Sequence, residues 1–267
     1  MTATTTLPVP SSRPSLAATV GDALAVAQRN LIALYRLPTT LVFSTVQPVI
    51  FVLMFRYVFG GAIETPGFRY VDYLMAGIFV QTVTFGSINT GVGLAIDMSN
   101  GLIERFRSLP MARSAVLAGR TIADSVRNLL VIFLMVVVGF LVGFRVQGNL
   151  AQFVGAMLLL LLFGFAMSWV MALIGLSTGN AEAAQAAAFP FMAVLVFASN
   201  SFVPTSTMPG PLRAYADHQP VSDTVDAVRG LLAGTATAPT VLAAVAWCLG
   251  IVAVFAPLAV RRYRRAG

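Results

Sequence analysis

Apolar runs of about membrane length, separated by short polar turns, fill most of the chain after residue 38. A helix needs about 20 predominantly apolar residues to cross the hydrocarbon core of a bilayer. Six stretches meet this requirement, at about residues 40–59, 70–96, 114–144, 150–177, 186–203 and 239–260. The pattern predicts an all-α integral membrane protein with six transmembrane helices.

The chain before the first span has a different pattern. From Leu16 to Arg36 apolar residues recur at helical spacing, whereas the polar residues between Asp22 and Asn30 fall largely elsewhere around the helix. This amphipathicity predicts an interfacial helix. Residues 1–15 are rich in Thr, Ser and Pro and lack the basic region, apolar core and cleavage site of a secretory signal. We expect them to form a disordered cytosolic tail.

Composition narrows the class of protein. Hydrophobic residues make up 58% of the chain and charged residues 10%, and the mean hydropathy is +0.85. Such values are typical of integral membrane proteins, and no polar block is long enough for a separate soluble core. Residues 16–267 are therefore expected to form one transmembrane domain. All 17 basic residues are Arg, and a P-loop needs a Lys, so any ATP must be bound by another chain.

Few residues are available for catalysis or metal binding. The single cysteine, Cys248, lies inside the last apolar run, and the single histidine, His218, lies in an outer loop. One cysteine allows neither an intrachain disulfide nor a cysteine metal cluster, and we expect no catalytic or metal site in this chain. We attribute the net charge of +7 to cytosolic loops that contact anionic membrane lipids, and expect no nucleic-acid partner.

The distribution of arginine predicts the orientation, because cytosolic loops of membrane proteins are enriched in basic residues. With the N-terminus inside, twelve arginines face the cytosol and five face outward. The cytosolic set is Arg13, Arg29, Arg36, Arg105, Arg107, Arg113, Arg120, Arg127, Arg261, Arg262, Arg264 and Arg265. The outer set is Arg56, Arg69, Arg145, Arg213 and Arg229. Both termini are therefore expected in the cytosol.

Several polar side chains lie inside the predicted spans. Such residues bond across helices or line a water-filled pathway, and the sequence leaves both interpretations open. A proline at Pro48 similarly indicates either a structural kink or a substrate contact. The candidates for a translocation pathway are Gln47, Gln81, Thr84, Ser87, Asn89 and Asn200.

Three charged residues share one face at the start of the third span. Asp124 follows Arg120 by four residues and precedes Arg127 by three, spacings that favour pairing on a helix. We expect a salt-bridge cluster near the cytosolic boundary, with a role in transport as the alternative. Between the fourth and fifth spans, Gly179 to Gln185 is expected to be a short return loop.

The stretch from Pro204 to Thr237 is too broken by proline to cross a bilayer and too apolar for an ordinary solvated loop. We expect re-entrant or interfacial helices there. One of them is predicted to begin with Ser222 as its cap, to pair Asp226 with Arg229, and to stop at Gly230.

An Arg-dense segment at residues 100–113 interrupts the apolar pattern between the second and third spans. Leu102, Phe106 and Leu109 follow helical spacing and would be buried together, while Glu104 and the arginines point to water. Pro110 then ends the helix. A helix lying flat at the cytosolic face suits mechanical coupling to a soluble partner, and an interfacial anchor explains the same amphipathicity.

The same segment carries a family resemblance. The run Gly-Leu-Ile-Glu-Arg-Phe-Arg-Ser-Leu-Pro-Met-Ala-Arg-Ser, starting at Gly101, resembles the signature of type-2 ABC exporter permeases, among them the daunorubicin-resistance permeases. The resemblance covers nearly all of the chain after residue 16, including Gln47-Pro48 in the first span and Asp226-Ala227-Val228-Arg229 before the last. Two positions depart from the family pattern, Ala76 and His218.

The resemblance implies a multi-pass permease of a bacterial plasma membrane that moves a hydrophobic or amphipathic drug or lipid outward. It implies no bound cofactor in this chain, two partner ATPase subunits that bind ATP and Mg, and a second permease, identical or a sister chain. By the same resemblance residues 16–36 form a connecting helix, and 204–237 form re-entrant helices that close an outer gate. The gate candidates that the resemblance implies are Pro204, Asp226 and Arg229. The coupling residues it implies are Leu102, Glu104, Arg105, Phe106, Arg107, Leu109 and Pro110.

Two other classes compete with this interpretation. A secondary transporter driven by an ion gradient would be expected to carry paired charges near the bilayer midplane, whereas the sequence suggests charges near the span ends. An integral membrane lipid enzyme would need a cluster of catalytic groups, and His218 beside Asp217 is the nearest to one.

Overall fold

The computed structural model describes residues 38–60, 65, 67–101 and 113–265, together with four separate positions before residue 38. Every regular element within these residues is helical, as the sequence predicts. The predicted tail and nearly all of the predicted interfacial helix at 16–36 lie outside the described residues. The same is true of the predicted coupling residues 102–110.

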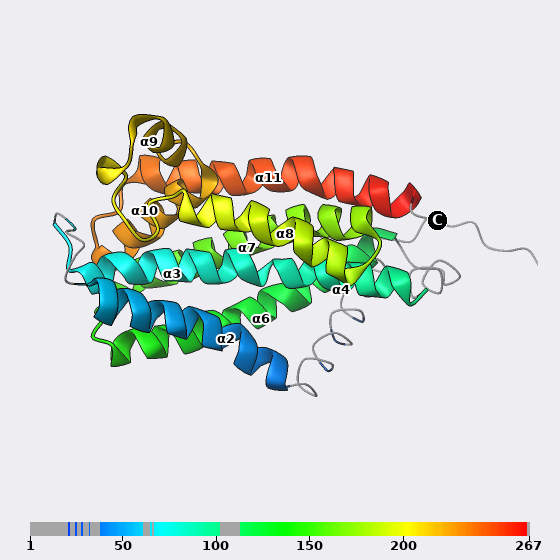
Figure 1. Cartoon of the computed structure of the whole chain (residues 1–267), viewed down its shortest axis with the longest axis horizontal. Helices are drawn as coiled ribbons and strands as arrows, with labels where there is room; N and C mark the ends of the chain where they lie inside the picture. Colours follow the sequence, from blue (N-terminus) through cyan, green and yellow to red (C-terminus); the bar gives the residue numbers. More distant parts are fainter. Residues whose placement is uncertain are drawn as a thin grey trace, which may run out of the picture.

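The long helices run roughly parallel or antiparallel to one another in a bundle, with the short helices gathered at one end (Figure 1). Within the described residues the bundle itself is formed by seven helices. They are α2 Pro38–Leu53 with the π-helical turn η1 Met54–Phe59, α3 Tyr70–Gly86, α4 Ile88–Ser99, α6 Arg113–Leu141, α7 Leu150–Thr178, α8 Ala181–Phe197 and α11 Ala238–Arg265. The short elements are η2 Thr205–Thr207, α9 Gly210–Ala216 and α10 Pro220–Ala233.

Four helical segments of the described chain are long and apolar enough to cross a membrane: Tyr70–Ser99, Gly119–Leu141, Leu150–Thr178 and Ala238–Tyr263. Two further apolar helices, Thr45–Phe59 and Ala181–Phe197, are shorter. They correspond to the first and fifth predicted spans. The helical membrane architecture is therefore confirmed, and the count of six spans stays a prediction.

The second predicted span is not one uninterrupted helix. It divides into α3 and α4 at Ser87, whose hydroxyl donates to the carbonyl of Thr84 at 2.6 Å. The carbonyl of Gly86 accepts side-chain hydrogen bonds from Arg127, at 2.7 Å, and Asn89, at 3.2 Å. Polar side chains thus stabilise a break near the middle of this segment, where the hydropathy pattern predicted continuity.

The predicted return loop at 179–185 is wrong, because α8 begins at Ala181. Gly179 ends α7 with φ 77°, a left-handed conformation that glycine adopts without strain. The side chain of Asn180 then accepts a hydrogen bond from the backbone N–H of Ala183 at 2.7 Å and caps α8. The fifth helix consequently spans 181–197 and not 186–203, and residues 198–203 turn toward the short helices.

The predicted limits of the helix after Ser222 are also wrong. Gln219 is the N-cap residue and Pro220 occupies the first turn of α10, where a proline costs no backbone hydrogen bond. Ser222 instead lies inside the helix and accepts a hydrogen bond from the backbone N–H of Asn200 at 3.3 Å. The helix continues through Gly230 and ends at Gly234, which has φ 77°.

The elements between Pro204 and Thr237 are too short to cross a bilayer, because α10 has 14 residues and α9 has 7. They pack at one end of the bundle, with α10 against α3, α7 and α11 (Figure 1). This agrees with the prediction of a segment that does not span the membrane. Its re-entrant placement in a bilayer stays a prediction.

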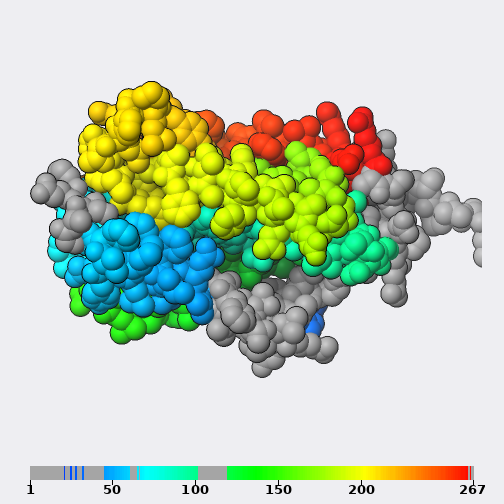
Figure 2. All heavy atoms as spheres, viewed as in Figure 1, coloured from blue at the N-terminus to red at the C-terminus, as the bar shows by residue number. Residues whose placement is uncertain are grey.

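Helix α7 is the centre of the bundle, and it packs against α3, α4, α6, α8, α10 and α11. Its closest crossing is with α4, where Gly91 faces Gly175 with no side chain between the two backbones. On the face shown in Figure 2, α2 and α8 lie in front of α3. Accordingly 83% of the most apolar window of Tyr70–Ser99 is buried.

Candidate functional site

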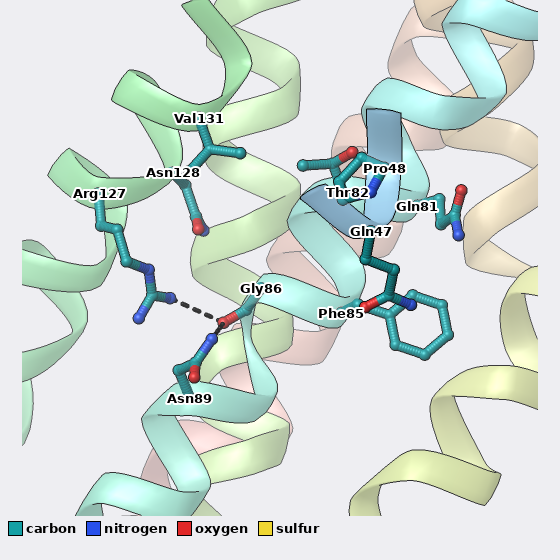
Figure 3. Close-up of a pocket in the computed structure, with 10 residues that line it drawn as sticks. All are labelled: Gln47, Pro48, Gln81, Thr82, Phe85, Gly86, Asn89, Arg127, Asn128 and Val131. Carbon is teal, nitrogen blue, oxygen red and sulfur yellow. Dashed lines mark hydrogen bonds between the residues drawn. The ribbon is translucent and has the colours of Figure 1, made fainter. Parts of the chain in front are cut away.

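A polar cavity of about 80 Å³ lies among α2, α3, α4 and α6. Glutamine and asparagine residues line it from all four helices, and a guanidinium borders it from α6 (Figure 3). Its lining consists of Gln47, Pro48, Gln81, Thr82, Phe85, Gly86, Asn89, Arg127, Asn128 and Val131. Polar groups are expensive in a bilayer interior, so a cavity lined by several of them is a candidate functional site.

Three predicted pathway residues meet at this cavity, namely Gln47, Gln81 and Asn89. Thr84 and Ser87 do not line it. The Thr84 hydroxyl is buried and donates to the carbonyl of Val80 at 2.6 Å, and the Ser87 hydroxyl bonds within its own turn. The helical periodicity of α3 and α4 therefore places Thr84 and Ser87 away from this cavity, although the sequence grouped them with its lining residues by polarity alone.

Arg127 and Asn128 were not among the predicted pathway residues, although both line the cavity. The sequence did contain a feature that could have identified them, because both are polar residues inside a predicted apolar span. Arg127 pairs with Asp124 at 3.0 Å, and both side chains are about nine-tenths buried. Asp124 also accepts a hydrogen bond from the hydroxyl of Thr90 on α4. The ion pair thus has a polar partner on the neighbouring helix.

The charged cluster predicted on α6 is partly wrong. Arg127 pairs with Asp124 as expected, but Arg120 pairs with Asp97 of α4 at 2.6 Å. Arg127 is the midpoint of α6, about 21 Å from either end at 1.5 Å per residue. The Asp124–Arg127 pair therefore lies near mid-helix and not at a helix end.

Two buried polar atoms at the cavity have no hydrogen-bond partner within the described part of the chain: Gln81 Oε1 and Asn128 Nδ2. Buried polar atoms in native proteins are nearly always paired with protein groups or with ordered water. One of these atoms accepts and the other donates. The lining residues Gln81 and Asn128 therefore each carry one buried polar atom that no described protein group satisfies.

A second cavity, of about 260 Å³, lies where the short helices meet α3, and all three gate candidates border it: Pro204, Asp226 and Arg229. The Arg229 guanidinium lies 3.6 Å from the ring centroid of Tyr73, donates to Asp226 at 2.8 Å and donates to the Asn200 carbonyl at 3.0 Å. The Tyr73 hydroxyl donates to the same carbonyl at 2.9 Å. Asn200, a predicted pathway residue, thus belongs to this second cluster.

Electrostatics in this second cluster follow from burial. Loss of solvent raises the pKa of the Asp226 carboxyl above its usual value, and the nearby Arg229 opposes that rise. Loss of solvent also lowers the pKa of Arg229, which Tyr73 and Asp226 oppose. The pair is held in place by the cation–π contact and the carbonyl bond as well as by charge. These contacts join α10 to α3.

The predicted coupling residues Leu102 to Pro110 lie outside the described residues, but the helices on both sides of them are described. α4 ends at Ser99 and α6 begins at Arg113. A β-carbon added at Gly93 would overlap the Arg120 guanidinium, so the two helices are in close contact next to the Asp97–Arg120 pair. The Arg-dense segment therefore connects two helices that are also joined directly to each other.

Comparison with known proteins identifies relatives along nearly the whole chain. Residues 22–233 match the ABC-2 type transporter family. The chain is 37% identical to the daunorubicin resistance ABC transporter permease protein of Streptomyces coeruleorubidus, over 94% of this chain and 89% of that protein. It is 27% identical to a probable doxorubicin resistance ABC transporter permease protein of Mycobacterium tuberculosis, over 97% and 94% of the two chains.

A more distant similarity extends beyond bacteria. A putative transport permease of Porphyra purpurea is 25% identical over 79% of this chain and 74% of that protein. The family match covers the first cavity, the Arg-dense segment and the second cavity except for Thr235, Ala236 and Thr240, and the relatives at greater coverage extend over α11. Together with the apolar helical bundle, these matches show that the chain is a membrane permease of the ABC-2 type transporter family.

Proposed function

We propose that this permease exports a hydrophobic or amphipathic drug or lipid, powered by a separate ATPase subunit that docks on the Arg-dense segment. The observation that carries the proposal is the pair of charged contacts between α6 and α4, next to a polar cavity near the middle of the bundle. In this proposal two ATPase subunits bind ATP and Mg, and a second permease completes the transporter. Both termini are in the cytosol.

Force would reach the cavity through α6. The ATPase subunits close on ATP and press on residues 102–110, which precede α6 in the chain by two residues. The Asp97–Arg120 ion pair and the tight packing at Gly93 make α4 move with α6. Further along α6, the hydrogen bond from Arg127 to the Gly86 carbonyl acts on the break between α3 and α4. A shift of α6 therefore changes the angle of that break and the shape of the cavity.

The cavity is too small for a whole drug in this state. Sites for drug-sized ligands occupy about 300–1,000 Å³, whereas this cavity measures about 80 Å³. It can hold a few waters or one polar group of a cargo molecule. In the proposed cycle the cavity enlarges when α6 moves, and Gln47, Gln81 and Asn89 then bind the polar part of the cargo.

The second cavity is the proposed outer gate. Arg229 connects α10 to α3 through Tyr73 and to the turn after α8 through the Asn200 carbonyl. Opening the gate would require these contacts to break together. The names of two relatives refer to daunorubicin and doxorubicin resistance, which supports an amphipathic drug as cargo.

Vesicles test the proposal. The permease is expressed with an ABC ATPase subunit that copurifies with it, and ATP-dependent daunorubicin uptake is measured in inside-out vesicles. The double variant Glu104→Arg with Phe106→Asp should abolish uptake with membrane insertion intact, and Arg213→Gln on exposed α9 serves as the control. Uptake by the double variant at the wild-type rate would overturn the docking assignment.

A charge swap tests the α6–α4 connection separately. Arg120→Asp should leave ATP hydrolysis in place but lower uptake at least tenfold, because two carboxylates then face each other. The swapped pair, Arg120→Asp with Asp97→Arg, should restore uptake. Loss of uptake in the swapped pair with normal insertion would show that this ion pair does not transmit force.

The Asp124–Arg127 pair near the middle of α6 favours one other function, transport driven by an ion gradient, because such transporters carry paired charges at the midplane. The two mechanisms differ in their energy source. Uptake that persists without ATP and collapses when the proton gradient is dissipated would support this alternative and contradict the ATP-driven one.

A further inference from the structure

A basic face occupies the last turns of α11. Leu258, Arg261, Arg262 and Arg265 are spaced by three and four residues, which places them on one side of the helix. With Leu173 of α7 they line a cavity of about 290 Å³. The cavity is therefore a groove between the ends of two long helices, with three guanidinium groups above two leucines.

No described residue that lines the groove carries a negative charge to balance the three arginines. All three arginines are exposed. The groove therefore combines a charge of +3 with an apolar floor, of which Leu258 is 40% exposed. A ligand that suits both parts carries an anionic group next to a hydrocarbon chain.

The end of α11 is held rigidly, so the arginines are not on a free tail. Tyr263 is only 1% exposed and packs with Leu94, Trp169 and Leu176. This packing attaches the last turn of α11 to α7 and α4, at the end of the bundle where α4 terminates (Figure 1). The helical turn that carries the arginines therefore has a fixed position relative to Leu173.

The groove also lies at the depth of lipid headgroups. The apolar span Ala238–Tyr263 ends among these arginines, so Leu258 lies within the span and Arg265 lies beyond it. Arginine binds phosphate through two parallel hydrogen bonds, and basic pockets between transmembrane helices accept anionic headgroups. We propose that the α7–α11 groove binds the phosphate headgroup of an anionic membrane lipid, with one acyl chain along Leu173 and Leu258.

The proposal concerns a site at the edge of the bundle and holds whether or not the cargo pathway is assigned correctly. Basic residues near an anionic membrane surface contribute about 1 kcal/mol each, which corresponds to about fivefold in affinity. Replacing two of the three arginines should therefore weaken lipid binding about 30-fold. The side chains are exposed, so these replacements should leave the fold intact.

Native mass spectrometry of the full chain, released from vesicles of phosphatidylglycerol and phosphatidylcholine in equal amounts, measures this binding. The wild type should retain phosphatidylglycerol selectively, and Arg261→Gln with Arg265→Gln should lose it. Arg213→Gln, at the other end of the bundle, should bind as the wild type does. The double lysine variant at positions 261 and 265 should retain part of the binding, because lysine keeps the charge but loses the paired hydrogen bonds.

Three outcomes would overturn the proposal. Equal retention of phosphatidylglycerol by the wild type and the double glutamine variant would place the lipid elsewhere. Displacement of the lipid by millimolar inorganic phosphate would identify a site for free phosphate and not for a lipid. Loss of ATPase copurification in the glutamine variant, with lipid retention unchanged, would make the groove a protein-docking surface.

Discussion

The crossing of α4 and α7 allows one prediction to be worked out from atomic positions. Gly91 of α4 lies so close to α7 that an added β-carbon would be 2.6 Å from the carbonyl oxygen of Met171 and 3.2 Å from its carbonyl carbon. Close carbon–oxygen contacts in proteins are about 3.3 Å. Gly91→Ala therefore requires the two backbones to separate by about 0.7 Å.

That separation is costly because both helices are buried there. The crossing is equally close at Gly175, whose added β-carbon would overlap the backbone of Gly91. Forcing extra carbon atoms into a packed core costs about 1–3 kcal/mol. Alanine also stabilises a helix by up to about 1 kcal/mol relative to glycine, and this gain partly offsets the cost.

Comparison with a matched glycine-to-alanine variant separates the cost of the clash from the gain in helix propensity. Gly250 on α11 has no atom within 4 Å of its would-be β-carbon, so Gly250→Ala gains helix propensity without a clash. The two variants should differ in free energy of unfolding by about 1–3 kcal/mol, with Gly91→Ala the less stable. Unfolding in mixed micelles with increasing denaturing detergent measures this difference. Equal stabilities would refute the close crossing of α4 and α7.

Three further predictions follow from the buried polar clusters. Arg127→Met should cost about 3–5 kcal/mol because it leaves Asp124 buried without its cation, and Arg127→Met with Asp124→Leu should recover most of that loss in the same unfolding assay. Arg229→Lys should lose about 1 kcal/mol, because lysine cannot stack flat on Tyr73 and bond two acceptors together. Tyr73→Phe in the Arg229→Lys background should cost about a further 1 kcal/mol, because the buried hydrogen bond from the Tyr73 hydroxyl to the Asn200 carbonyl is lost. Partial loss of solvent raises the pKa of Asp226, whose side chain stays 47% exposed, so the folded chain binds its proton at a somewhat higher pH than the unfolded chain. The stabilising effect of protonation is complete below pH 3.8 and is lost as the pH rises through the folded pKa, and Asp226→Asn should flatten this part of a stability–pH curve.

The helices themselves could be predicted closely from hydropathy. The predicted spans at 150–177 and 239–260 differ from α7 and from the apolar part of α11 by a few residues at most. In a bilayer a long apolar run has one low-energy conformation, a helix, because a helix forms its backbone hydrogen bonds within the same segment. The conformation therefore depends on the local sequence. The ends were predicted less well where a cap decides them, as at Asn180 and Pro220.

The candidate sites were predicted in part. Pro204, Asp226 and Arg229, which the sequence identified only through a family resemblance, lie at one cavity, and their role as a gate stays a prediction. The interpretation of Thr84 and Ser87 as cavity residues is not supported, because their hydroxyls bond to their own helix. Polarity alone does not distinguish a hydroxyl that bonds to its own helix from a side chain that lines a cavity.

The membrane class, the helical architecture and the family are determined by the sequence itself, because they depend on composition, on periodicity and on the motif that begins at Gly101. Only the tertiary structure decided which charged side chains pair with each other. Within α6, Arg120 is spaced equally well for Asp124, yet it pairs with Asp97 because α4 crosses beside it where Gly93 leaves room. Likewise Gln47 and Arg127 meet at one cavity although they lie far apart in the sequence. Helical spacing limits which side chains share a face, but which face meets which neighbour depends on packing between helices.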